Sequence, residues 1–246
     1  KIPLDVVKAT MNKISRLLPR SCVKLRILHS KTPIMKIQLF SKISVDLVLH
    51  DAHGVLMSRV LSHLFTRSSP DLVRLVCMDK HWAKSRGLID ASRGNLSSYA
   101  FTLLVVHYLQ SLGVVGEVVF FAEAEDFFDP IFTRDEIMKI VRANQVCWTI
   151  ENPERSYCGE DVYELFHSFL ENLHSMFVSE RHFELTDISG NYTRICCCCV
   201  DSKQSLKVAE HGMLVLIEPI SRTNVASVLT RKRFDVLIEE ISTQIS

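Results

Sequence analysis

The chain has 246 residues, of which 47% are apolar and 23% are charged, and its formal net charge is +1 at pH 7. This length is enough for one large or two modest hydrophobic cores, and the composition is ordinary for a globular protein. The near-neutral charge excludes a global basic field, so any contact with a nucleic acid has to come from a local patch. No apolar run reaches the roughly 20 residues that a membrane span needs, so we expect no contact with a membrane.

The first part of the chain is predicted to be a small mixed unit of one helix and three strands. Residues 5–18 carry apolar side chains at helical spacing. Residues 23–28 and 34–39 alternate apolar and polar side chains, as half-buried strands do. Residues 44–49 are predicted to form a third strand, which is apolar except for a single acid, Asp46.

From residue 55 onward the pattern changes to long helical segments rich in Leu, Val and Phe, separated by turn signals. The predicted helices are residues 55–66, 70–86, 97–111, 135–144, 160–178 and 231–242. Residues 193–200 and 213–218 are β-like, and residues 119–134 read as an irregular acidic and aromatic loop. The predicted fold class is therefore α+β, with the small mixed unit followed by a mostly helical domain.

The chain contains eight cysteines and no secretory signal. Outside one run of consecutive cysteines none of them has CxxC spacing, and none has zinc-finger spacing with histidine. Four are consecutive, from Cys196 to Cys199. Neighbours on a strand point to opposite faces, so this run cannot close a tetrahedral site by itself, and a structural strand is favoured over metal or redox chemistry. The cysteine pattern indicates a reducing, intracellular compartment.

Two features near the strands and the first long helices could carry chemistry. A carboxylate within an apolar strand is costly unless it is paired, so Asp46 is either a solvent-facing residue of an edge strand or a cation ligand. Lys80 and Lys84 would lie one helical turn apart. Two ammonium groups so placed either share an anion, for which a triphosphate is suited, or belong to a solvated basic face.

A third feature is the SSYA segment, in which serines precede an apolar helical run. This pattern is typical of a helix N-cap, and a helix N-terminus also receives phosphate oxygens well. Tyr99 would stand in the first turn, where its ring is either a base-stacking platform or an ordinary core residue.

The order and spacing of these features resemble the terminal uridylyltransferases and the related poly(A) polymerases, and most closely the kinetoplastid-type uridylyltransferases. The resemblance begins with the strand acid and HGVLMSRVL, and its most specific part is LVRLVCMDKHWAKSRGLIDASRGNLSSYAFTLLVVHYLQ. YELFHSFLENL and LIEPISRTNVA are also similar, so the resemblance runs from about residue 4 to the end. It implies that residues 1–54 are the C-terminal part of a nucleotidyltransferase palm domain. Residues 55–246 would form the helical central and poly(A) polymerase-associated domain.

In that family, three carboxylates hold two Mg²⁺ (or Mn²⁺) ions that assist phosphoryl transfer to an RNA 3′-hydroxyl. The resemblance implies that Asp46 is the third carboxylate, both catalytic and metal-binding. The family's Gly-Ser and Asp-x-Asp pair, which would precede the first helix, does not occur in the chain. We expect that pair upstream of Lys1, in a longer protein from which this chain is a portion.

The resemblance also implies a nucleotide pocket in the cleft between the two domains. The implied nucleotide-binding residues are Ser58, Lys80, Lys84, Ser98, Tyr99 and Glu218. The two lysines would hold the triphosphate, Ser98 would contact a phosphate or the sugar, and Tyr99 would stack on the base. Glu218 would help to read the edge of the base.

Two positions depart from the family pattern in the nucleotide pocket. Met57 stands where the family usually has an asparagine that binds the ribose 2′-hydroxyl, and a thioether makes that bond poorly. Ser221 stands where uridylyltransferases tend to carry a second base-reading acid, which weakens the preference for UTP over ATP.

Two hypotheses from different classes follow. The first is an enzyme that adds nucleotides to RNA 3′ ends without a template, with UTP favoured over ATP, conditional on the upstream Asp-x-Asp. The alternative is a catalytically degenerate subunit that acts as a scaffold or RNA-binding component of a ribonucleoprotein complex. A purely structural helical domain would require the KHWAK and SSYA segments to be accidental.

The expected partners are the RNA 3′ end, UTP or ATP, and other proteins of an RNA-processing complex. The expected location is intracellular, with the mitochondrion favoured and the cytoplasm as the alternative.

Overall fold

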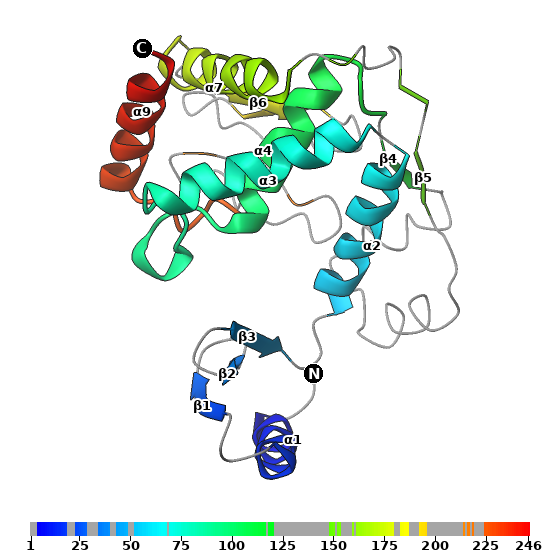
Figure 1. The fold of residues 1–246 in the computed structure, drawn as a ribbon, viewed down its shortest axis with the longest axis vertical. Coiled ribbons are helices and arrows are strands. Elements are labelled where there is room, and N and C mark those ends of the chain that lie inside the picture. The colour runs from blue at the N-terminus through cyan, green and yellow to red at the C-terminus, as the bar shows by residue number, and fades with distance from the viewer. Residues whose placement is uncertain are drawn as a thin grey trace. The chain divides into compact units, whose positions relative to one another are not determined.

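The structure is a computed structural model in which two compact units are distinguished. The described residues are 4–18, 23–28, 34–39, 43–48, 52–67, 69–116, 118–120, 148–150, 152–153, 159, 161–179, 183–186, 192–195, 214, 216, 218 and 224–246. One unit comprises Lys1–Leu56 with Thr133–Asn144, and the other comprises Met57–Phe132 with Gln145–Ser246. Figure 1 shows the helices and strands of both units.

The first unit contains one helix and a three-stranded antiparallel sheet. The elements are α1 (Leu4–Leu17), β1 (Val23–Leu28), β2 (Ile34–Leu39) and β3 (Ile43–Val48), and the strand order is β1-β2-β3. The predicted helix and the first two predicted strands are confirmed. The third strand begins and ends one residue earlier than predicted. Direct pairing across the sheet places Lys36 of β2 opposite Asp46 of β3.

The core of the first unit lies between α1 and the sheet. Met11 of α1 packs with Met35 and Ile37 of β2, and both methionine side chains are fully buried. Side chains alternate between the two faces of a strand, so Lys36, between these two core positions, belongs to the opposite face. The first four residues of β3 are exposed, and Asp46 is among them. The pleat of the sheet therefore directs Asp46 towards solvent.

The second unit is built mainly from long helices. These are α2 (Ala52–Thr66), α3 (Pro70–Ser85), α4 (Ser98–Ser111), α7 (Val162–Ser179) and α9 (Arg231–Ile245), of which α2 runs through the division between the units. Each of these helices was predicted from the sequence, with end points that differ by no more than three residues. The predicted helix at residues 135–144 lies outside the described residues.

Helices α4 and α7 form the centre of the second unit. Nine of the 14 residues of α4 are buried, which is typical of a helix that is surrounded by others. Helix α7 packs against α3, α4 and α9. Three aromatic pairs lie at these contacts, with ring centroids 5.3–6.0 Å apart: Trp82–Phe166, Tyr108–Phe169 and Phe177–Phe234. Pairs of this geometry add about 0.5–1.5 kcal/mol each beyond the area that they bury.

Two short antiparallel strand pairs complete the described part of the second unit. They are β4 (Val118–Phe120) with β5 (Trp148–Ile150), and β6 (Phe183–Thr186) with β7 (Tyr192–Ile195). The prediction of an irregular loop at residues 119–134 is wrong for its first two residues, which belong to β4, because pairing with β5 overrides the local pattern. The rest of that stretch lies outside the described residues.

The predicted β-like stretch at residues 193–200 overlaps β7, whereas Cys196 to Cys199 lie outside the described residues. In the predicted stretch at 213–218, residues 214, 216 and 218 are described, and none of the three is part of a strand. No helix within the described ranges combines the length and the apolar character that crossing a membrane requires.

Candidate functional site

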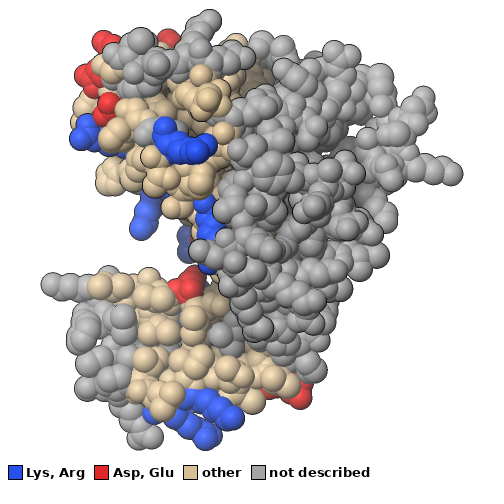
Figure 2. Space-filling view, turned by 90° about the vertical axis from the view of Figure 1, so that its right-hand side faces the viewer, with Lys and Arg blue, Asp and Glu red and all other residues tan. Residues whose placement is uncertain are grey.

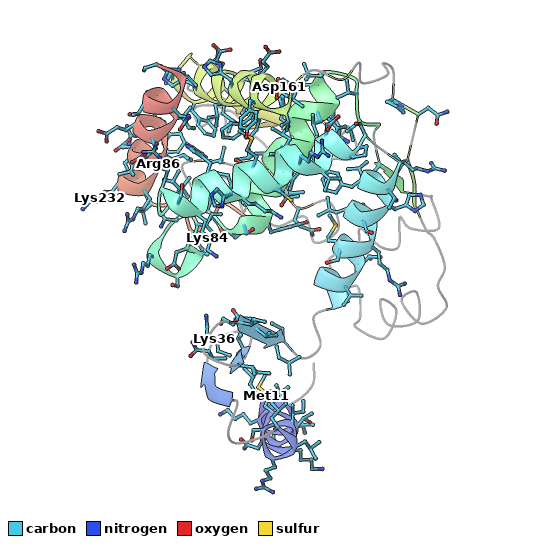
Figure 3. All side chains as sticks on the ribbon, in the orientation of Figure 1. Met11, Lys36, Lys84, Arg86, Asp161 and Lys232 are labelled. Carbon is cyan, nitrogen blue, oxygen red and sulfur yellow. The ribbon has the colours of Figure 1, made fainter. Side chains whose placement is uncertain are left out.

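Helix α3 presents the two lysines that the sequence singled out. Ser69 caps the helix by accepting a hydrogen bond from the Asp71 N–H at 3.3 Å, and Pro70 takes the first position, where its missing donor is harmless. The buried side of α3 faces the core. Lys84 is exposed and Lys80 is half-buried, and Figure 3 shows Lys84 on this helix.

Neither Lys80 nor Lys84 forms an ion pair within the described part of the chain. No carboxylate there lies within ion-pair distance of the Nζ atom of Lys80 or of Lys84. Like charges one turn apart destabilise a helix by a few tenths of a kcal/mol, which an anion bridging them would relieve. Figure 2 shows described lysines and arginines on the surface of both units.

The connection between α3 and α4 is held by two polar side chains. Asn95 is almost fully buried, and its Nδ2 donates to the Gly87 carbonyl at 3.2 Å while its backbone N–H donates to the Asp90 carbonyl at 3.1 Å. The Asp90 carboxylate accepts from the Ser92 N–H at 3.0 Å, and the hydrogen bond from the Ser92 hydroxyl lowers the pKa of Asp90. These bonds fix the chain that leads into α4.

The first turn of α4 has the geometry of a capped helix N-terminus. Ser97 is the N-cap, and its hydroxyl accepts a hydrogen bond from the Ala100 N–H at 3.1 Å, as the serine pattern predicted. Ser98 is the first helical residue and its side chain is exposed. The positive end of the helix dipole and its first N–H groups favour an anion at this position.

Tyr99 and Glu218 are brought together by the fold, although they are 119 residues apart in the sequence. The Tyr99 hydroxyl donates to Glu218 Oε1 at 3.4 Å, and Glu218 is only 5% exposed. Burial raises the pKa of Tyr99 well above its usual value, and the charge and hydrogen bond of Glu218 raise it further. The tyrosine is therefore held neutral as a donor, and the glutamate is an acceptor at the start of α4.

Asn224 holds the segment that carries Glu218. Its Oδ1 accepts from the backbone N–H groups of Leu216 and Ala226 at 3.0 and 2.9 Å, and its Nδ2 donates to the Leu214 carbonyl at 3.0 Å. Leu214 and Leu216 are buried, as Glu218 is. The sequence reasoning did not single out Asn224, although it lies in LIEPISRTNVA, one of the segments that carry the resemblance.

Asp46 lies in the first unit and forms an ion pair there. Its Oδ2 is 3.5 Å from Lys36 Nζ, and the side chains are 48% and 47% exposed. A pair that is this exposed contributes little to stability. The sequence reasoning did not single out Lys36, and the signal was the register of two strands that are close in sequence, which places residue 36 opposite residue 46.

The described residues do not by themselves form a site for Mg²⁺ or Mn²⁺. These cations prefer several oxygen ligands, whereas Asp46 offers one carboxylate with an ammonium group beside it. No group of three or more His, Cys, Asp or Glu side chains is placed to hold a metal ion in the described part of the chain. The metal-binding role of Asp46 stays a prediction.

Helix α2 carries Met57, at the position that was linked to the sugar of a nucleotide, and Ser58, which was predicted to bind the nucleotide. Met57 is 3% exposed, so its side chain belongs to the hydrophobic core. Ser58 is exposed, and its role in nucleotide binding stays a prediction. Ser221 lies outside the described residues.

Asp79 is a buried acid that the sequence reasoning missed. It is fully buried on the core side of α3, and neither carboxylate oxygen has a hydrogen-bond partner among the described residues. Burial raises the pKa of Asp79 well above its usual value, although the charge of Lys80 acts in the opposite direction. The available signal was a single acid at a position that the helical period assigns to the core.

The chain is similar in sequence to poly(A) RNA polymerases over part of its length. It is 38% identical to poly(A) RNA polymerase GLD2-A of Xenopus laevis over 93 residues, which cover 36% of this chain and 18% of that protein. It is 33% identical to poly(A) RNA polymerase GLD2 of Danio rerio over 113 residues, which cover 44% of this chain and 21% of that protein. The matches thus span about a fifth of these relatives. No protein-family profile matches the chain.

The fold is similar to that of solved terminal uridylyltransferases over nearly the whole chain. Terminal uridylyl transferase 4 from Trypanosoma brucei, with bound UTP and UMP, superposes with a TM-score of 0.68 over 96% of this chain and 70% of that chain, at 17% identity. The Cid1 poly(U) polymerase superposes with a TM-score of 0.64 over 100% of this chain and 72% of that chain, at 16% identity. These likenesses confirm the predicted α+β fold, which is mostly helical.

The predicted resemblance is therefore confirmed at the level of fold and of relationship. The comparisons give no support to a mitochondrial location or to a preference for UTP. The chain has the fold of solved terminal uridylyltransferases, and over part of its length it is similar in sequence to poly(A) RNA polymerases.

Proposed function

We propose that the chain is the nucleotide-binding part of an enzyme that adds nucleotides to RNA 3′ ends without a template. The observation that carries the proposal is the pair of Tyr99 and Glu218 at the start of α4. Helix α4 packs against α3, on which neither Lys80 nor Lys84 forms an ion pair with a described carboxylate. A ring, an acceptor and cations are the groups that recognise a base and its phosphates.

Each residue has a distinct proposed role in binding the nucleoside triphosphate. Lys80 and Lys84 neutralise the triphosphate, and Ser98 donates to a phosphate or sugar oxygen beside the N-terminus of α4. The ring of Tyr99 stacks on the base. The carboxylate of Glu218 accepts a hydrogen bond from the edge of the base. Ser58 is a further proposed contact.

The preference of UTP over ATP is the finer part of the proposal. A carboxylate can accept from N3–H of uracil or from the N6 amino group of adenine, so Glu218 alone does not select between them. Some relatives are named as poly(A) polymerases and some as uridylyl transferases, so both triphosphates have to be compared directly.

Catalysis is proposed to depend on Asp46 as one catalytic and metal-binding carboxylate, with a requirement for Mg²⁺ or Mn²⁺. In this proposal residues 1–54 belong to a palm domain, and residues 55–246 form the central and poly(A) polymerase-associated domain. The proposed partners are an RNA 3′ end and other proteins of an RNA-processing complex.

A second candidate function is a catalytically degenerate subunit that holds RNA or partner proteins. Two observations favour it. Asp46 is paired with Lys36, so its charge is already compensated, and Met57 places an apolar, buried side chain where a sugar contact was expected. Such a subunit would bind nucleotide or RNA without transferring a nucleotidyl group.

Primer extension separates the two candidates. The full-length protein is incubated with a short labelled RNA, Mg²⁺ or Mn²⁺, and each nucleoside triphosphate in turn. We expect extension with UTP ahead of ATP, its loss in Asp46→Ala, and no loss in the matched control Glu239→Ala, which changes an exposed acid on α9. Folded protein that extends RNA with none of the four triphosphates would favour the degenerate subunit instead.

A further inference from the structure

Helix α9 contacts the last turn of α3 through a small polar network. Gln244 Oε1 accepts a hydrogen bond from the indole Nε1 of Trp82 at 3.2 Å and another from Arg86 Nη2 at 3.5 Å. Arg86 Nη1 is also 3.3 Å from Glu240 Oε2. Arg86, labelled in Figure 3, lies between the end of α3 and α9. One amide oxygen thus holds two donors that flank Lys84 in the sequence.

The other end of α9 contacts the connection that leads into α4. The backbone N–H of Thr230, the residue before α9, donates to the Gly94 carbonyl at 3.1 Å. Gly94 has φ +79°, and a Cβ atom there would lie 2.8 Å from Thr230 Cγ2. The contact therefore requires glycine, for conformation and for space. Gly94 lies only a few residues before Ser98 and Tyr99 in the sequence.

The polar contacts are separate from the apolar contacts that hold α9 in place. The buried residues of α9 are Phe234, Leu237 and Ile241, and Phe234 packs against Phe177 of α7. Gln244 follows Ile241 by one turn and is itself exposed. Replacing Gln244 therefore leaves the apolar anchor of α9 intact while it removes the acceptor for Trp82, whose ring is buried.

We propose that α9 is a clamp for the nucleotide site, and that Gln244 is a positioning residue for Lys84. The inference rests on the proposed binding of a triphosphate by α3. Gln244 restrains the turn of α3 that carries Lys84 by holding the side chains of Trp82 and Arg86. Without this acceptor, the last turn of α3 loosens and the ammonium group of Lys84 is no longer held where it meets the phosphates.

The test is a calorimetric titration of the chain with UTP and with ATP in Mg²⁺. We expect Gln244→Leu to weaken binding about threefold to tenfold, the range of one lost hydrogen bond between protein groups. Gln244→Glu keeps an acceptor for both donors and should restore binding. Thr243→Ala is the matched control, because among the described residues its hydroxyl donates only to the Glu239 carbonyl of its own helix. If Gln244→Leu does not fold, Glu240→Gln, which removes the ion pair with Arg86, replaces it.

A double-mutant cycle with Lys84→Met shows whether Gln244 acts through Lys84. If it does, Gln244→Leu should cause little further loss in the Lys84→Met background. A thermal midpoint that falls in Gln244→Leu while affinity stays at the wild-type value would overturn the clamp and leave only a structural contact. The clamp would also be overturned if Gln244→Leu weakened binding by the same factor in the Lys84→Met background as in the wild type. A wild-type chain that binds neither triphosphate would overturn the proposed function itself, and the clamp with it.

Discussion

The two units hold their polar groups in different ways. In the first unit, Asp46 and Lys36 are each about half exposed, and Asp46 Oδ2 lies 3.5 Å from Lys36 Nζ. In the second unit, Glu218 and Asn95 are buried and hydrogen-bonded to other parts of the chain. A half-exposed pair contributes about 0–1 kcal/mol, whereas a buried polar group left without a partner costs about 1–3 kcal/mol. The candidate base-binding groups are thus fixed by the fold, and the candidate catalytic acid is fixed mainly by its strand.

Because of this difference, we expect substitutions in the second unit to affect both function and stability, and a substitution at Asp46 to affect function alone. A substitution at Asp46 should change chemistry and leave stability nearly untouched. A substitution around Tyr99 should affect both binding and packing. The predictions that follow test this contrast, from the largest expected effect to the smallest.

The largest effect is expected for Asp46→Ala. If Asp46 is catalytic, primer extension should fall by about a thousandfold or more, as it does when a group that acts at the reacting atoms is removed. The thermal midpoint should stay within a degree or so of the wild type, because the lost ion pair is half exposed. Full extension by the variant would show that Asp46 has no catalytic role. A large fall in midpoint would break the contrast between the units.

Tyr99→Ala should weaken nucleotide binding by about 1–3 kcal/mol, the usual contribution of a base stacked on an aromatic ring. Tyr99→Phe keeps the ring and removes only the hydrogen bond to Glu218, so it should lose less. Isothermal titration with UTP and ATP measures both variants. Affinities that do not change in Tyr99→Ala would contradict the assignment of this residue to the nucleotide site.

Asp79 tests the cost of a buried acid in the second unit. Replacing it by leucine should stabilise the protein at pH 8 by about 1–3 kcal/mol, because its carboxyl group is buried without a hydrogen-bond partner among the described residues. Urea unfolding of wild type and Asp79→Leu measures the difference. A variant that is less stable than the wild type at this pH would indicate a partner for Asp79 outside the described residues.

The free energy of unfolding of the wild type, compared with that of Asp79→Asn, should depend on pH with a defined sign. Burial raises the pKa of Asp79 in the folded state, so between the unfolded and folded pKa values the folded chain binds more protons than the unfolded chain. The stability contributed by this group is therefore greatest below the unfolded value of 3.8 and is lost as the pH rises through the folded value. The advantage of Asp79→Asn over wild type should grow from pH 5 to pH 8. An advantage that is constant with pH would contradict the raised pKa.

The smallest effect is expected for Lys36→Met. Loss of its half-exposed ion pair should change the free energy of unfolding by less than about 1 kcal/mol, measured by urea unfolding. The control is Lys13→Met, which changes an exposed lysine of α1 that lies outside the sheet. A larger loss specific to Lys36 would show that the first unit, like the second, depends on its polar pair.

Much of the fold could be predicted from the sequence, because local patterns carry it. Alternating side chains at residues 23–28 and 34–39 and helical spacing at 70–86 gave elements that the structure confirms within one residue. The serine pattern also predicted the capped start of α4, because capping depends on neighbours three residues apart. Residues 119–120 were predicted wrongly, because a three-residue strand depends on its partner β5 and carries no period of its own.

The sequence by itself determined the order of helices and strands, the helical face of Lys80 and Lys84, and the pattern that relates the chain to the nucleotidyltransferases. Only the tertiary structure decided which distant groups meet. It brought Glu218 within hydrogen-bond distance of Tyr99, and Gln244 within hydrogen-bond distance of Trp82. It also left Asp79 buried without a described partner. Periodicity reports which face of an element is apolar, whereas these contacts depend on how the faces of different elements are brought together, and no local pattern encodes that.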